Sequence, residues 1–101
     1  MVIFAALLAA CATAPVQEMS DARQAIVAAK QAGASQEAPA ELAKAQHYLQ
    51  NAEQALQRHD FGRARASAEK AKEAASGALR VSRRFNDDKP TNELKSPPKS
   101  P

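Results

Sequence analysis

Apolar residues, most of them alanine or leucine, recur at alternating intervals of three and four along two consecutive stretches of this 101-residue chain. Such spacing places a row of side chains on one face of an α-helix, whereas a strand would scatter them over both faces. The sequence therefore predicts two amphipathic helices, one over residues 39–58 and about 30 Å long, the other over residues 61–83. The first row is Leu42, Ala45, Leu49, Ala52 and Leu56, and the second is Phe61, Ala64, Ala68, Ala71, Ala75 and either Ala78 or Leu79.

The connection between these two helices, His59 to Gly62, is short enough to force them into an antiparallel hairpin. Asp60 is expected to cap the second helix, because a short carboxylate can accept a hydrogen bond from its first turn. Alanine at most facing positions lets the two backbones approach near the short end of the usual ~8–10 Å range. Gly77 is the one weak point expected in the second helix.

A shorter helix is expected ahead of the hairpin, over residues 20–32, and Gly33 is expected to end it. Pro15 is expected to keep the residues before Ser20 out of the helix. Residues 33–38 are expected to form a loop, and Pro39 suits the first helical position of the next element. The apolar face of the shorter N-terminal helix is formed by Met19, Ala22, Ile26 and Ala29. The predicted fold is all-α, an alanine-rich hairpin plus a shorter N-terminal helix.

A lone cysteine follows a short apolar stretch and two alanines near the start of the chain, in the run Leu-Leu-Ala-Ala-Cys. This run resembles a bacterial lipobox, in which small residues let a signal peptidase approach the backbone and the cysteine receives the lipid. The resemblance implies that Cys11 becomes a lipid-carrying N-terminus, and that the signal peptidase recognises Leu8, Ala9 and Ala10. The apolar run is far shorter than the ~18 residues of a membrane span.

Only Met1 precedes the apolar run, so the basic residues usual in a signal peptide are missing. Either the true start is expected upstream or the chain is expected to be truncated. Ala12 after the cysteine, in place of aspartate, favours the periplasmic face of the outer membrane by analogy with enteric bacteria. The charged, proline-rich C-terminal end predicts disorder. The predicted organisation is a signal peptide at residues 1–10, a lipidated cysteine and tether at 11–18, a helical domain at 19–85 and a disordered tail at 86–101.

The chemistry expected of this chain is limited. His47 and His59 are the only histidines, and neither has a cysteine or carboxylate at metal-ligand spacing. Ser67 and Ser76 have no base nearby that would make them nucleophiles. We therefore expect no enzyme activity, cofactor or metal, and exposed, polar roles for both histidines. Large apolar residues are few for helices of this length, which favours a protein partner or self-association.

Residues 58–84 carry eight basic and three acidic side chains, a net charge of +5. One interpretation is a solvated helix face with internal ion pairs. A second is contact with anionic headgroups or an acidic partner through Arg80, Arg83 and Arg84, beside an apolar end that the N-terminal helix is too short to cover. That end would contain Leu79, Val81 and Phe85. Nucleic acid is not expected as a partner, because export removes the chain from DNA and aromatic residues for base stacking are lacking.

Several stretches together resemble the family called domain of unknown function 4398, which consists of short alanine-rich bacterial envelope proteins. The stretches are Ala32-Gly33-Ala34, Ala38-Pro39-Ala40-Glu41-Leu42, and the Asp60-Phe61 pair with the alanines that follow it. The family implies a lipoprotein signal, a helical domain and no assigned activity. Some relatives continue into a domain similar to the peptidoglycan-binding part of outer-membrane protein A, whereas this chain ends in a Pro/Lys tail.

Residues 59–71 also resemble the middle of a tetratricopeptide repeat, although only one hairpin is visible where an array needs about three. The sequence thus favours a non-enzymatic envelope lipoprotein with a structural or adaptor role through helix–helix contacts. The alternative is a tetratricopeptide-like module that binds a partner or a peptide.

Overall fold

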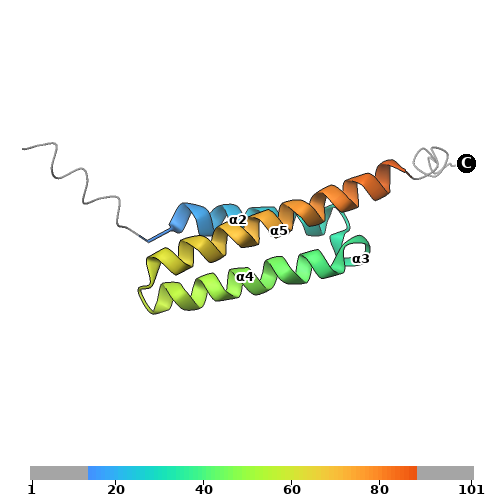
Figure 1. Cartoon of the computed structure of the whole chain (residues 1–101). Helices are drawn as coiled ribbons and strands as arrows, with labels where there is room; N and C mark the ends of the chain where they lie inside the picture. Colours follow the sequence, from blue (N-terminus) through green and yellow to red (C-terminus); the bar gives the residue numbers. More distant parts are fainter. Residues whose placement is uncertain (1–13, 89–101) are drawn as a thin grey trace, which may run out of the picture.

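In a computed structural model of the chain, which describes residues 14–88, the elements are all helical (Figure 1). Three long helices pack side by side, with a short helix at one corner. They are α2 (Val16–Gln31), α3 (Ala34–Glu37), α4 (Pro39–Gln57) and α5 (Phe61–Asp87). The predicted all-α hairpin with a shorter N-terminal helix is confirmed.

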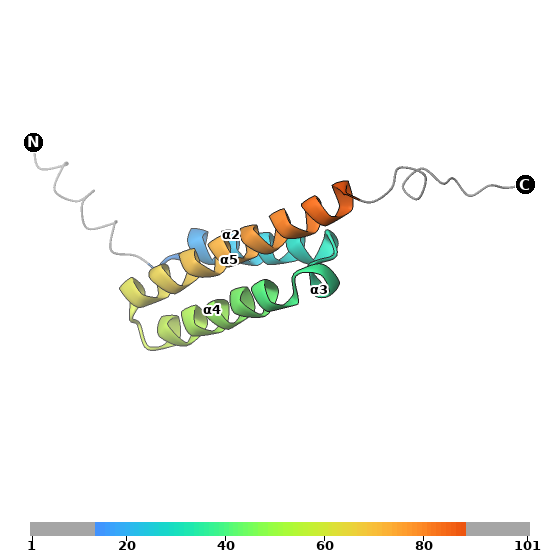
Figure 2. The same ribbon diagram turned by 45° about the vertical axis from the view of Figure 1, so that its right-hand side comes forward.

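The central helix is α5, which packs along α4 on one side and along α2 on the other, whereas α2 and α4 touch more lightly (Figures 1 and 2). The tight turn at residues 58–60 makes α4 and α5 antiparallel. Helix α2 runs parallel to α5. Glu18 near the start of α2 pairs with Arg65 near the start of α5, and the carbonyl of Ala32 after the end of α2 accepts from Asn86 near the end of α5.

The interior of the bundle is built mainly from alanine. Small side chains at facing positions let the helices approach closely, and burying each methyl group removes apolar surface from water. Larger core residues are few: Met19 and Ile26 come from α2, and Leu42 comes from α4. The alanines with no exposed surface are Ala22, Ala29, Ala34, Ala45, Ala52, Ala64, Ala68, Ala71, Ala75 and Ala78.

Both turns have the local chemistry that their sequences predict. Gly33 adopts the left-handed φ of 94° just after α2, as expected of a glycine that ends a helix. Asp60 caps α5 by accepting a hydrogen bond from the backbone N–H of Arg63 at 3.2 Å. His59 is also left-handed, with φ 64°. Its N–H donates to the Leu56 carbonyl at 3.0 Å, and the next N–H donates to Ala55, which closes α4 in a Schellman motif.

Three predicted boundaries were wrong. Helix α2 begins at Val16 instead of Ser20, because Pro15 lies just before the helix, where its missing N–H costs no helical hydrogen bond. The expected loop at residues 33–38 contains the single turn α3, whose Gln36 and Glu37 N–H groups donate to the Gly33 carbonyl. Helix α5 passes through Gly77 and continues to Asp87, beyond the expected end at residue 83.

Candidate functional site

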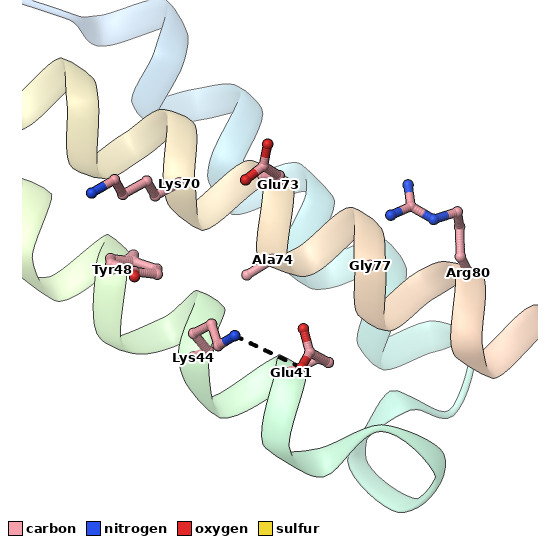
Figure 3. A pocket seen from close by; sticks show the side chains of 8 residues that line it. All are labelled: Glu41, Lys44, Tyr48, Lys70, Glu73, Ala74, Gly77 and Arg80. Carbon is pink, nitrogen blue, oxygen red and sulfur yellow. Dashed lines mark ion pairs between the residues drawn. The ribbon is translucent and has the colours of Figure 1, made fainter.

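A groove of about 430 Å³ lies between α4 and α5, on the side of the hairpin away from α2 (Figure 3). It opens where α5 presents only small residues, Ala74 and Gly77, opposite α4. Its lining comes from about two turns of α4 and about three turns of α5, so the hairpin alone positions it. The lining residues are Glu41, Lys44, Tyr48, Lys70, Glu73, Ala74, Gly77 and Arg80.

The apolar part of this groove is formed by the half-buried ring of Tyr48 together with Ala74 and Gly77. The ammonium of Lys70 lies 5.7 Å from the centroid of the Tyr48 ring, within the range of a cation–π contact. At Gly77 a Cβ atom would lie 3.7 Å from Oε2 of Glu41, so the missing side chain leaves ordinary van der Waals space. The groove therefore has a narrow apolar floor beside an aromatic ring.

The rim of the groove is charged. The ammonium of Lys44 and the carboxylate of Glu41, one turn apart on α4, pair at 3.9 Å. Among the ion pairs of residues 14–88, none involves Glu73, Lys70 or Arg80. These side chains are exposed and border the groove, and in Figure 3 those of Glu73 and Arg80 extend from the side of α5 away from α4. The rim can therefore offer both signs of charge to a ligand, with an excess of cations.

The flank of α5 on the side away from the groove packs against α2. Arg65 pairs with Glu18 at 3.3 Å, and Lys72 pairs with Asp21 at 3.9 Å. The guanidinium of Arg23 on α2 pairs with Glu53 of α4 at 3.2 Å. Part of the basic charge of α5 thus forms ion pairs within the bundle. This agrees with the interpretation of that charge as a solvated helix face with internal ion pairs.

The three arginines singled out from the sequence are all exposed on α5. Arg80 and Arg84 are one turn apart on the face that borders the groove. Arg83 follows Lys72 by eleven residues, three helical turns, and so lies on the flank that faces α2. The structure thus brings Arg80 and Arg84 together with the groove and turns Arg83 toward α2. Cys11, Leu8, Ala9 and Ala10, predicted for lipidation and cleavage, lie outside the described residues.

The far end of α5 differs in part from expectation. Val81 and Phe85 are 43% and 51% exposed, as the sequence suggested. Leu79 is half-buried against the core cluster that contains Ile26, so its assignment to the uncovered end was wrong. The idea that the N-terminal helix cannot reach this end was also wrong, because Asn86 Nδ2 donates to the Ala32 carbonyl at 3.3 Å. Because α2 runs parallel to α5, the turn after Gln31 brings Ala32 beside the end of α5.

Both histidines are exposed on the surface, as predicted. The His47 ring lies 6.3 Å from that of Tyr48, and the His59 ring lies 5.9 Å from that of Phe61. Within residues 14–88, no group of three metal-ligating side chains is assembled. No helix in the same range has both the length and the apolar character that crossing a bilayer requires.

The groove itself was missed by reasoning from the sequence, which regarded Gly77 only as a weak point of its helix. The signal that could have found it is the pairing of a large aromatic residue on α4 with two small residues on the facing turn of α5. Such a pairing leaves the aromatic ring at the side of an unfilled space.

Comparison with known proteins gives one match. The family model described as "Domain of unknown function (DUF4398)" matches residues 17–86, which covers nearly all of the four helices. No curated protein and no solved structure matches the chain.

Proposed function

The chain belongs to the DUF4398 family, and from this premise we propose that it is a non-enzymatic envelope lipoprotein with a structural or adaptor role through helix–helix contacts. In this proposal Cys11 carries the lipid, and the bundle is held at the periplasmic face of the outer membrane. The lipobox-like run before Cys11 supports the anchor, and the alanine-rich bundle with charged outer faces supports the adaptor role.

The single observation that carries the proposal is how close Cys11 lies to the bundle along the chain. Helix α2 begins at Val16, five residues after Cys11, and five steps of extended chain reach at most about 18 Å. An anchored cysteine would therefore hold the start of α2, and with it the turn between α4 and α5, next to the bilayer. The groove and the C-terminal end of α5 would then lie toward the end of the bundle that is farther from the membrane, where a partner can reach them.

The anchor is tested by expressing the chain behind a functional signal peptide, as wild type and as Cys11→Ser. The wild type should partition into detergent and gain the mass of the lipid, and Cys11→Ser should do neither. A single acyl chain binds membranes only weakly, so stable partitioning also reports multiple acylation. Equal partition and equal mass of the two proteins would refute the lipoprotein proposal.

The adaptor role is tested by complementation of a strain that lacks the protein. An envelope defect should be rescued by the wild type, but not by Cys11→Ser or by a folded variant with altered groove charges. Rescue by both variants would contradict an adaptor held at the membrane.

The groove between α4 and α5 also fits the alternative, a tetratricopeptide-like module that binds a partner or peptide. The two proposals differ in the bound form of the partner. A helical partner would gain helical circular dichroism on binding, whereas a peptide bound in extended form would not.

A further inference from the structure

We propose that the groove and the exposed end of α5 form one continuous surface that binds an acidic amphipathic helix of a partner protein. This inference rests on the proposed adaptor role and names the surface and the partner class. We call it the groove surface. Its apolar floor is Tyr48, Ala74, Gly77, Val81 and Phe85, and its basic rim is Lys44, Lys70, Arg80 and Arg84.

The continuity of the floor follows from the spacing along α5. Ala74, Gly77, Val81 and Phe85 are separated by three, four and four residues, so they lie along one stripe of the helix. The first two line the groove (Figure 3), and the last two follow along α5, whose C-terminal end extends beyond the start of α4 (Figure 2). This is the spacing of the buried seams on the other side of α5, and it matches the apolar stripe of a packing helix.

The small residues of the floor favour a helix as the occupant. Ala74 and Gly77 present little or no side chain, which lets a partner backbone approach closely. Val81 and Phe85 then offer larger exposed apolar side chains two turns further along. A partner helix could therefore place large apolar residues over Ala74 and Gly77, and small ones over Val81 and Phe85.

The charge of the rim selects an acidic partner. Three cations of the rim line the groove with two carboxylates, those of Glu41 and Glu73, and Arg84 follows one turn beyond Arg80. Glu41 is already paired with Lys44. Within residues 14–88, no ion pair involves Lys70, Arg80 or Arg84, so these cations remain available to carboxylates of a partner. Asp87 and Asp88 lie at the end of α5 and would repel acidic residues placed beyond Arg84. The expected register therefore puts partner carboxylates between Lys70 and Arg84.

Two other occupants fit less well. In a symmetric dimer the same patch meets itself, so the basic rim would face a second basic rim with only two acids on each side. Membrane-surface helices need a broad face of large apolar residues, whereas this floor is narrow and partly recessed between two helices. The aspartates at the end of α5 would also repel anionic headgroups.

The test uses the full chain carrying Cys11→Ser, which removes lipidation and leaves the described bundle intact. The probe is a fluorescent 21-residue helical peptide with Leu and Ala on one face and Glu on both flanks. Matched probes carry Lys in place of Glu, or the same composition in scrambled order. Fluorescence anisotropy at low salt should show binding of the Glu peptide at least about tenfold tighter than of either control peptide, because rim charges act through complementarity.

Variants locate the site. Lys70→Glu with Arg80→Glu should weaken binding of the Glu peptide at least about tenfold and reverse the preference toward the Lys peptide. Lys30→Glu with Arg58→Glu makes the same change of net charge away from the groove surface and should keep the preference. Gly77→Leu fills the floor and should also weaken binding, with retained helical circular dichroism as the check on folding.

Several outcomes would overturn the proposal. These are equal binding of the Glu, Lys and scrambled peptides, or equal loss of binding in the groove variants and the matched control. Sedimentation that shows a dimer dissolved by Lys70→Glu with Arg80→Glu would assign the surface to self-association. Binding to anionic vesicles that is lost in the same variants would assign it to lipid. Because every protein in this test lacks the lipid, failure of the anchor proposal leaves the result unaffected.

Discussion

The two glycines at Gly33 and Gly77 should respond in opposite directions to replacement by alanine. Gly77 lies inside α5, where glycine is about 1 kcal/mol less favourable than alanine. An added Cβ would lie 3.7 Å from Oε2 of Glu41 and 3.9 Å from a guanidinium nitrogen of Arg80, both ordinary contact distances. No strain offsets the gain, so Gly77→Ala should raise the free energy of unfolding by about 1 kcal/mol.

At Gly33 the same substitution meets two penalties. The backbone φ of +94° is left-handed, which costs an L-residue about 1–2 kcal/mol. The new Cβ would also lie 2.9 Å from Oε1 of Glu37, so that carboxylate must move. Gly33→Ala should therefore lower the free energy of unfolding by about 1–2 kcal/mol. Gly62 serves as the control, because a Cβ there meets nothing within 4 Å.

Thermal and urea unfolding followed by circular dichroism, on chains that also carry Cys11→Ser, measures all three changes. For a domain of this size, 1 kcal/mol corresponds to a shift of about 4–8 °C in Tm. Gly77→Ala should melt higher and Gly33→Ala lower, with Gly62→Ala, in the first turn of α5, between the parent and Gly77→Ala. A lower Tm for Gly77→Ala would refute the argument that the groove floor has room, and an unchanged Tm for Gly33→Ala would refute the left-handed turn.

Three further substitutions test the packing and the turns. Ala68 is fully buried beside Met19 and Ala52, so Ala68→Leu should lower the free energy of unfolding by about 1–3 kcal/mol. Urea unfolding measures this change, and an equal or higher midpoint would contradict a close helix contact at Ala68. Asp60→Ala removes the cap of α5 and should cost about 1 kcal/mol, read from the same melts, whereas Asp60→Asn should retain most of it. His59→Gly relieves a left-handed φ of 64° and should raise Tm, and a fall would mean that the ring contact with Phe61 outweighs the backbone strain.

The hairpin could be predicted from the sequence because its alanine and leucine rows each keep one helical period. Ala64 and Ala68 are fully buried, since three-and-four spacing places both on the inner face of α5, where Ala68 packs with Met19 and Ala52. Gly33 and Asp60 were found for a similar reason, since left-handed helix ends and N-caps depend on one residue and its immediate neighbours. Local rules of this kind operate without knowledge of the tertiary packing.

The parts that the sequence did not predict depend on the third dimension. A single turn such as α3 has no period to detect, and it is held by the Gly33 carbonyl. The end of α5 extends further than its apolar row, because Asn86 bonds to the Ala32 carbonyl of another segment. The groove beside Tyr48 stays open because α2 packs on the other flank of α5 and does not cover it. The helical period of the sequence does not say on which flank of α5 the helix α2 packs.

The parallel course of α2 and α5 has a mechanical consequence. The described chain enters the bundle at one end and leaves it at the other, with α5 of about 40 Å between them. A pull applied between these two ends runs along the helix axes, so it loads the alanine seams and the Glu18–Arg65 and Asp21–Lys72 pairs in shear, all at once. Many short contacts must then slip together before any helix separates. The bundle should therefore resist tension applied along its length more than a pull that peels one helix from its end.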